Sequence, residues 1–451
     1  MTTAETTHAG KDTRIGAART ELTSRIDPGR IVTKAAGLTK AAAIWNGAVN
    51  NRPAMVVQCK TTADVQHAVR TAGKFNLPLS VRGGGHDWAG RAIRADGLVI
   101  DLTNMRDVST HGRIATVEGG ATAEDVAAAA DRLGLAVATG TVGSVGMTGL
   151  TLAGGYGPFC GRFGLAADNL VGAEVVLADG QIVHAGRENN RDLLWALRGG
   201  GGNFGVVTSI DVALHPLAEI LSGSFTFPFE DARTVLAGYG ELVDRAPDDL
   251  TAVLSIVPGD DGDPAIVVSP TWSGPIADGY SFMDEFAALA PPLATDVSVI
   301  SPLTKLRRLD GMLPDGANYA IRTRNIAALT PVVASGLLEA YSARREVGSF
   351  LNVHHFHGEA AHRAVESTAF GRRDNHLMVE MIETAGVVSD WTMTASTMLA
   401  THALPGGYPN LLGPDDEEQT AAAFGPNAPR LLDVKDRFDP HAVFRAVGAI
   451  R

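Results

Sequence analysis

The chain has little cysteine and no excess of basic residues. Cys59 and Cys160 are its only cysteines, so we expect no disulfide framework to hold the fold. It carries 38 Lys and Arg against 50 Asp and Glu, a net charge of −12, and therefore lacks the basic excess typical of proteins that bind nucleic acid or anionic membranes. The polar first residues form no apolar signal core, and no apolar run is long enough to span a bilayer. We predict a cytoplasmic protein without a nucleic-acid or membrane partner.

Glycine, by contrast, is abundant and concentrated. Three consecutive glycines, Gly83 to Gly85, follow an apolar run at 77–81 that is typical of a strand. Without a Cβ, such a loop can adopt positive φ and bring its N–H groups close to an anion. The pattern predicts a phosphate cradle, and His86 comes directly after it, where its ring would lie beside whatever is attached to the phosphates.

Two further glycine-rich regions lie at 138–157 and 199–208. Glycine costs about 1 kcal/mol in a helix interior relative to alanine, so this density indicates close approach to a ligand such as a dinucleotide. A nicotinamide Rossmann fold would require G-x-G-x-x-G after the first strand and an acidic residue about 20 positions later. That context is missing here.

Strands and helices alternate in the first half of the chain. We predict strands at 55–59, 79–81, 97–101 and 114–117, with helices at 62–75 and 122–133. From about residue 218 the pattern changes to several strands followed by helices, which is typical of a mostly antiparallel sheet with helices on one face. The expected strands there are 221–227, 250–257, 265–272, 319–323, 348–357 and 376–383, and the helices are 278–289, 330–342 and 391–404. The fold class is therefore α+β, with two lobes.

The first glycine segment carries a resemblance to a known family. Arg82, Gly83, Gly84, Gly85, His86 and Gly90 match the pattern R-G-G-G-H-[ST]-x-x-G. This resembles the first flavin-binding motif of the vanillyl-alcohol oxidase / p-cresol methylhydroxylase flavoproteins, in the branch similar to berberine bridge enzyme and 6-hydroxy-D-nicotine oxidase. The resemblance implies FAD bound covalently through His86 to the flavin 8α-methyl. Asp87 departs from it, since the family usually has Ser or Thr at that position.

The resemblance also implies a domain organisation and a set of cofactor contacts. It predicts an FAD-binding PCMH-type domain (19–217), a substrate-binding domain (218–404) and a C-terminal segment that returns to the FAD domain (405–451). The Thr-, Ala- and Gly-rich composition of residues 1–18 predicts a disordered N-terminus. The residues implied to contact FAD are Arg82, Gly83, Gly84, Gly85, His86, Asp87, Gly90, Gly143, Ser144, Val145, Gly149, Gly154, Gly155, Asn203, Gly205, Val206, Val207, Tyr408 and Asn410.

Two positions in this set bear on the chemistry. Val142 occupies the position at which many relatives attach FAD a second time through cysteine, so a second bond is not expected. Cys160 lies well past that position and is expected to be a small buried residue. Val145 aligns with the family's oxygen gatekeeper, where valine goes with oxidases; simple core packing is the alternative.

The strand expected at 348–357 resembles a ligand wall. Alternation places Phe350, Asn352, His354 and Phe356 on one face, while the other carries apolar residues that can pack on helices. His354 lies near the position at which berberine bridge enzyme carries its glutamate base, and a neutral histidine could accept a proton from a substrate hydroxyl or amine. Packing through hydrogen bonds is the alternative.

Other candidates for catalysis or substrate binding lie on neighbouring segments. Glu380 is the second candidate base, and Tyr408 and Asn410 resemble the family's Y-x-N motif near the flavin. Arg322 and Arg324 share one strand face and could bind a substrate carboxylate or be solvated.

A metal site is not expected in this chain. The histidines at 354–362 lack metal-binding spacing, because they match neither H-E-x-x-H nor a helical pair followed by a third ligand.

We therefore predict an FAD-dependent oxidase. Its small-molecule substrate, a sugar, alkaloid, amine or secondary metabolite, would lose a hydride from a carbon bearing OH or NH, and O₂ would be reduced to H₂O₂. A dehydrogenase of the same fold with another acceptor is the first alternative. A flavin-carrying binding protein with little turnover is the second, and the titratable residues His354, Glu380 and Tyr408 argue against it.

Overall fold

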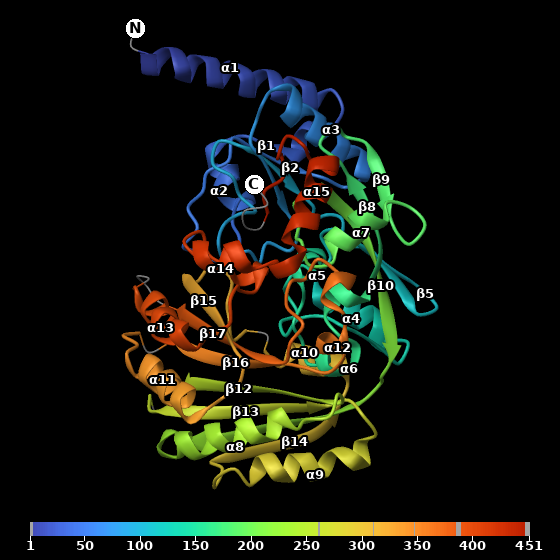
Figure 1. Ribbon diagram of the computed structural model, residues 1–451. Helices are drawn as coiled ribbons and strands as arrows, with labels where there is room; N and C mark the ends of the chain where they lie inside the picture. Colours follow the sequence, from blue (N-terminus) through green and yellow to red (C-terminus); the bar gives the residue numbers. More distant parts are fainter. Residues whose placement is uncertain (1–2, 260–261, 310, 347, 385–388, 447–451) are drawn as a thin grey trace.

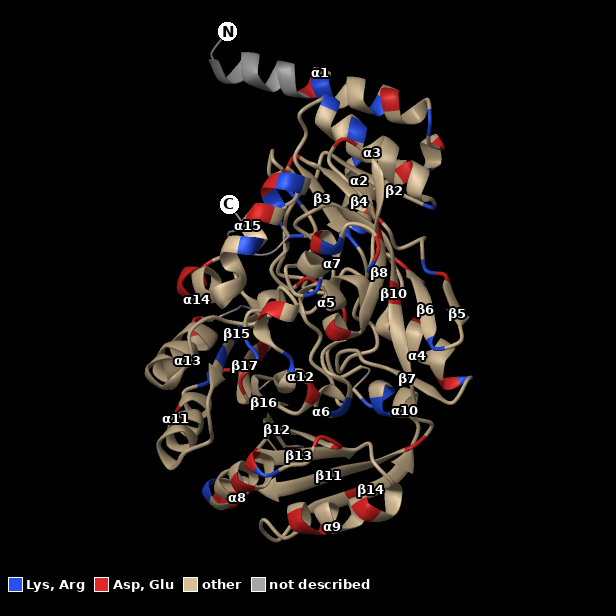
Figure 2. Ribbon diagram, turned by 45° about the vertical axis from the view of Figure 1, so that its right-hand side comes forward, with Lys and Arg blue, Asp and Glu red and all other residues tan. Residues whose placement is uncertain are grey.

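The computed structural model describes residues 3–259, 262–309, 311–346, 348–384 and 389–446. An upper lobe is built from the first half of the chain together with its C-terminal segment, and a lower lobe holds a large sheet (Figure 1). Acidic and basic residues are interspersed along the chain in both lobes (Figure 2). Among the described helices, none is long and apolar enough to cross a membrane.

A small sheet forms the top of the upper lobe. Its strand order is β1-β2-β4-β3, and α1, α2 and α3 pack against it. The β2–β4 and β4–β3 pairs are parallel, as the strand–helix–strand order predicts. Helix α3 begins with a capping box at Thr61. The elements are α1 (Thr3–Thr23), β1 (Ile31–Val32), α2 (Ala35–Ala41), β2 (Met55–Gln58), α3 (Thr62–Lys74), β3 (Leu79–Arg82) and β4 (Leu98–Asp101).

The prediction that residues 1–18 are disordered is wrong for the described part of that segment. Helix α1 begins at Thr3, and Ala18 and Leu22, four residues apart on one helix face, are fully buried in the core beside α3. The polar composition of the segment concealed this short apolar face, which is stabilised by packing against another helix rather than by helix propensity.

A second sheet forms the rest of the upper lobe. Its order is β5-β6-β10-β8-β9, and β7 also pairs with β10, the long central strand. Strand β6 agrees with the strand predicted at 114–117. The elements are β5 (Val108–His111), β6 (Ile114–Glu118), α4 (Ala123–Asp131), β7 (Leu135–Val137), α5 (Met147–Ala153), α6 (Cys160–Phe163), β8 (Leu170–Val176), β9 (Ile182–Ala185), α7 (Arg191–Leu197) and β10 (Val206–Pro216).

The lower lobe is a seven-stranded, wholly antiparallel sheet in the order β14-β11-β13-β12-β16-β17-β15. Helices α8, α9, α11 and α13 cover the face that points away from the upper lobe (Figure 1). The elements are β11 (Ile220–Pro228), α8 (Ala232–Asp244), β12 (Leu250–Pro258), β13 (Pro264–Trp272), α9 (Ile276–Ala287), β14 (Ala294–Ile300), α10 (Pro302–Arg307), β15 (Tyr319–Ile326), α11 (Pro331–Ser342), β16 (Phe350–Phe356), α12 (Glu359–His362), β17 (His376–Thr384) and α13 (Trp391–Leu399). The sheet and its helices agree with the predicted arrangement, although α8, β14 and α10 were not anticipated.

The C-terminal segment returns to the upper lobe through α14 (Glu417–Ala422) and α15 (Ala428–Phe438). Its anchor is the fully buried Lys435, whose ammonium donates to Asp439 and to the backbone carbonyls of Asn203 and Phe444. Because an unpaired buried ammonium is costly, these bonds fix the segment against the third glycine loop.

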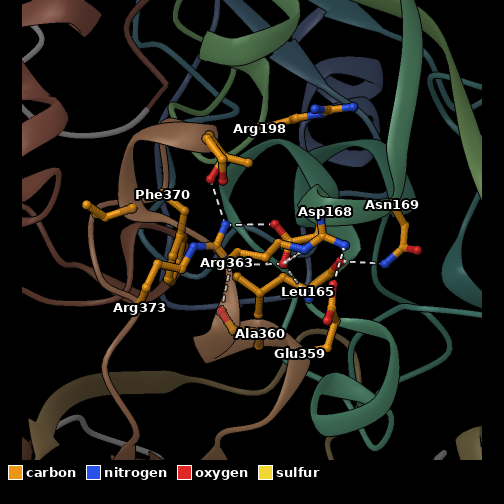
Figure 3. Close-up of polar contacts among 12 residues, drawn as sticks. Leu165, Asp168, Asn169, Arg198, Glu359, Ala360, Arg363, Phe370 and Arg373 are labelled. Carbon is orange, nitrogen blue, oxygen red and sulfur yellow. Dashed lines mark hydrogen bonds and ion pairs between the residues drawn. The ribbon is translucent and has the colours of Figure 1, made fainter.

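A buried ion pair joins the lobes on the other side. Arg373 donates to both carboxylate oxygens of Asp168, at 2.9 and 2.7 Å, and the guanidinium of Arg363 lies 3.7 Å from the same carboxylate (Figure 3). Asp168 belongs to the upper lobe, whereas both arginines lie between β16 and β17 of the lower lobe. The pair therefore connects the glycine-loop region to the large sheet.

Candidate active site

A cavity of about 1130 Å³ lies between the lobes. The glycine loops of the upper lobe line one side, and the uncovered face of the seven-stranded sheet lines the other. Most of the predicted cofactor-binding, substrate-binding and catalytic residues line this cavity. They are Gly83, Gly84, Gly85, His86, Asp87, Val145, Gly149, Gly205, Val207, Asn352, His354, Glu380, Tyr408 and Asn410.

The first two glycine loops touch each other through their backbones. A Cβ at Gly84 would lie 2.5 Å from the amide nitrogen of Gly146, and Gly85 has φ 76°, in the left-handed region. Side chains are therefore excluded here for reasons of space and backbone conformation. The result is a cavity wall made of exposed backbone, which is what close approach of a phosphate requires.

His86 follows this wall and is held by aromatic stacking. Its ring lies 4.3 Å from that of Trp45, which in turn stacks on Tyr319 at 3.8 Å. Its Nε2 is buried and has no hydrogen-bond partner among the described residues. Burial lowers the pKa of His86 to about 4, so the ring is neutral at physiological pH and retains a nucleophilic lone pair.

On the opposite wall, three polar side chains from two adjacent strands form a group. His354 and Asn352 on β16 lie beside Glu380 on β17, and Asn352 and Glu380 are direct cross-strand partners. Glu380 Oε2 accepts a hydrogen bond from Asn352 Nδ2 at 3.0 Å and lies 3.1 Å from His354 Nε2. The predicted alternation therefore brings both candidate bases, His354 and Glu380, into contact.

The protonation of Glu380 depends on this group. Burial raises the pKa of its carboxyl, but the hydrogen bond and the charge of His354, with the hydrogen bond of Asn352, lower it more. The resulting pKa lies below its ordinary value, so Glu380 is a buried carboxylate at neutral pH. Both hydrogen bonds end on Oε2, which leaves Oε1 as the oxygen available to a ligand.

Tyr408 and Asn410 lie beside the second glycine region. The Tyr408 hydroxyl accepts hydrogen bonds from the Gly155 amide at 2.8 Å and from Asn410 Nδ2 at 3.1 Å. With both acceptor positions used, the hydroxyl can still donate one hydrogen bond. Burial raises the pKa of Tyr408, so it is a neutral donor at physiological pH.

Several predicted cofactor residues do not line the cavity, and of the three hydrogen bonds described next only that of Gly155 joins a residue that does. Arg82 donates to the Ala41 carbonyl, Gly143 accepts from Glu124, and Gly155 donates to Tyr408. The predicted cofactor residues outside the lining are Arg82, Gly90, Gly143, Ser144, Gly154, Gly155, Asn203 and Val206.

Arg322 and Arg324 are corrected as candidates for substrate binding. The Arg322 guanidinium lies 3.2 Å from Asp416, and that of Arg324 lies 3.4 Å from Glu418. Both side chains point to the C-terminal segment, and it is Ile321, the neighbour of Arg322, that lines the cavity. The acidic partners lie more than ninety positions later in the sequence, so nothing local indicated that the arginines were already paired.

Two expectations concerned cysteine: that Cys160 is buried, and that Val142 replaces the cysteine of a second FAD link. Cys160 is buried and outside the cavity lining, and its thiol donates to the His355 carbonyl. Burial raises its pKa to about 11, so it is unreactive. Val142, at the position of a second cysteine link, does line the cavity.

Sequence reasoning missed other lining residues. Trp45 and Lys305 reach the cavity from segments that carry no motif, so no local signal could have found them. Tyr156 could have been noticed, because it interrupts the glycines at 154–157; its ring lines the cavity and its hydroxyl bonds His376 Nε2 at 2.8 Å.

Comparison with known proteins places this geometry in context. A family model described as an FAD binding domain matches residues 53–186, and one described as berberine and berberine like matches residues 407–451. These segments hold, respectively, the first two glycine regions and the Tyr408–Asn410 pair.

Full-length and partial relatives agree with these matches. An FAD-linked oxidoreductase of Dictyostelium discoideum is 26% identical over 89% of either chain. The (R)-6-hydroxynicotine oxidase of Paenarthrobacter nicotinovorans is 39% identical over 42% of either chain. The solved structure of 6-hydroxy-D-nicotine oxidase from Arthrobacter nicotinovorans superposes with a TM-score of 0.85 at 26% identity, covering 93% of this chain and 97% of that one. The predicted α+β, two-lobed fold is confirmed.

Proposed function

Because the chain belongs to the FAD-linked oxidoreductases that combine an FAD binding domain with a berberine-like C-terminal segment, we propose that it is an oxidase of small molecules. Its substrate, a sugar, alkaloid, amine or secondary metabolite, loses a hydride from a carbon bearing OH or NH and a proton from the heteroatom. O₂ takes up the two electrons and two protons and becomes H₂O₂. The observation that carries the proposal is the Glu380–His354–Asn352 group, which faces the same cavity as His86 and the glycine loops.

The residues present fit FAD. The backbone wall at Gly83–Gly85 and Gly146 suits phosphates, and the neutral, unpartnered imidazole of His86 suits covalent attachment to a flavin ring. When bound, FAD supplies the hydride acceptor and the site of reoxidation by O₂. Val145, the residue aligned with the oxygen gatekeeper, lines the cavity, which supports the oxidase over a dehydrogenase.

Glu380 is proposed as the group that receives the substrate proton. Its free oxygen, Oε1, accepts the proton from the substrate OH or NH, while Asn352 and His354 hold Oε2 and keep the carboxylate ionised. Tyr408, a neutral hydroxyl with one unused donor, hydrogen-bonds the substrate heteroatom or the cofactor, and Asn410 orients it.

The test begins with the flavin. A denaturing gel viewed under ultraviolet light should show a fluorescent band for the wild type and for His111→Ala, an exposed histidine on β5, but not for His86→Ala. Flavin released entirely by acid from the wild type would contradict covalent attachment, and protein purified without any flavin would contradict the function.

The chemistry is tested with a panel of alcohols, sugars and amines. The protein should bleach its flavin under anaerobic substrate and release H₂O₂ in air, and Glu380→Gln should lower kcat/KM by about 10²- to 10⁴-fold, the usual contribution of a positioned general base. Bleaching that persists in air would point to a dehydrogenase instead.

A further inference from the structure

The cavity extends beyond the Glu380–His354–Asn352 group to an end that is lined by two basic residues. There Lys305, on the short helix α10, lines the cavity and donates from Nζ to Ser222 Oγ at 3.1 Å. Arg308, just after α10, lines the same end and also reaches Ser222 Oγ, at 3.4 Å. Helix α10 lies between α4 and the edge of the large sheet, so this end belongs to both lobes (Figure 2).

The charge at this end is only partly balanced by the protein, because among the described residues Arg308 is paired with a carboxylate and Lys305 is not. Asp296 on β14 is 3.0 Å from Arg308, but within the described residues no carboxylate lies within 4.0 Å of Lys305 Nζ. Burial, with the nearby charge of Arg308, lowers the pKa of Lys305 to about 8. A partly buried ammonium that shares its neighbourhood with a guanidinium gains from an added anion.

A row of hydroxyl groups connects this end to the catalytic group. On the cavity face of β11, β12 and β13, the lining residues with hydroxyl groups are Ser224, Thr251, Ser255, Ser269 and Thr271. Strand pairing runs from His354 on β16 to Val253 on β12 and on to Ser269 on β13, with β11 next. Three strand steps of about 4.8 Å place β11, which carries Ser222, about 14 Å from β16, and a fourth step to β17, which carries Glu380, makes the separation about 19 Å.

We propose that Lys305 and Arg308 form a carboxylate-binding subsite, and that the substrate is an extended polyhydroxylated acid, such as an oligosaccharide with a terminal uronic acid. Its carboxylate binds at α10, its hydroxyls lie along Ser269 and Thr271, and the carbon that loses the hydride lies beside Glu380, about 19 Å away. This inference rests on the proposed function, because it names the substrate class of the same site.

Binding of two matched ligands tests the subsite without turnover. The probes are a trisaccharide with a terminal glucuronate and the same trisaccharide with a terminal glucose, titrated calorimetrically into the flavin-containing protein. The acidic ligand should bind about tenfold or more tightly, as one charge-assisted hydrogen bond implies. Lys305→Met should abolish that preference, whereas Lys60→Met, an exposed lysine, should preserve it.

The pH dependence provides a second readout. Binding of the acidic ligand should weaken as pH rises through about 8, where the free ammonium loses its proton, and binding of the neutral ligand should not. The charged groups that face Lys305 are Arg308 and Asp296, and the Lys305→Met variant shows whether the pH dependence comes from the ammonium rather than from either of them.

The outcomes separate this proposal from the function it rests on. Equal affinity for the two ligands, no binding of either, or a preference that survives Lys305→Met would overturn the subsite, even if other substrates bleach the flavin. Tight, Lys305-dependent binding of the acid without bleaching would uphold the subsite and count against the oxidase.

Discussion

The contact between His354 and Glu380 predicts how the activity depends on pH. The carboxylate must be ionised to accept a proton, and its pKa is held below the ordinary value of 4.5 by His354 and Asn352 against the opposing effect of burial. Activity should therefore be lost only as pH falls through that lowered pKa. Replacing His354 by Phe keeps a ring on β16 but removes the hydrogen bond and the charge, while Glu380 stays buried.

The size of the effect follows from the interaction that is lost. A hydrogen bond to a charged group contributes about 1.5–3 kcal/mol, equivalent to a factor of about 10 to 100 in the protonation equilibrium of Glu380. In a profile of kcat/KM against pH, the acid limb of His354→Phe should move to higher pH, so that on that limb the variant loses about 10- to 100-fold relative to wild type. At pH values above the acid limb, the kcat/KM values of the variant and the wild type should become equal.

The control is His362→Phe, a mostly exposed histidine on α12 that should leave the profile unchanged. An acid limb that stays in place in His354→Phe would refute the role given to the contact. A variant that is inactive at every pH would show that His354, rather than Glu380, receives the proton.

Three further substitutions test the support of the site. Gly84→Ala would place a Cβ 2.5 Å from the Gly146 amide, so the purified protein should lose most of its flavin absorbance; full flavin content would contradict the backbone wall. Asp168→Asn leaves Arg373 buried without its partner and should lower the free energy of unfolding by about 3–5 kcal/mol in denaturant titration, and an unchanged midpoint would show that the pair is dispensable. Tyr408→Phe should leave flavin attachment intact and lower kcat by about tenfold or more, whereas unchanged kcat would exclude the hydroxyl from the reaction.

The sequence predicted the parts of the site that depend on local backbone. The loop at Gly83–Gly85 could be recognised because a positive φ and a close backbone contact leave few alternatives to glycine. The cavity face of β16 could be recognised because alternation along a strand is fixed by geometry. The contact between His354 and Glu380 could not be predicted, because it depends on which strands are neighbours and in what register.

Contacts between distant segments explain why Arg322 was a wrong candidate for substrate binding and why Trp45 was missed. From the sequence, Arg322 was a candidate substrate ligand, but in the structure its guanidinium is paired with Asp416. Trp45 was not a candidate, because only the fold places its ring against that of His86. Both contacts join segments that are far apart in the chain, where a single sequence without an alignment gives no information about proximity.

The two walls of the cavity are constrained differently by the backbone that forms them. On the glycine wall, a single added Cβ at Gly84 meets backbone, which cannot move aside, so that wall accepts little change. On the sheet wall, a side chain such as Asn352 points into open cavity while its backbone stays in the ladder, so its identity can change without disturbing the fold. A carboxylate can therefore stand on β17 and be held from β16, as Glu380 is by His354, while Lys305 lines the same cavity from α10, beside Ser222 on β11, four strands from β17.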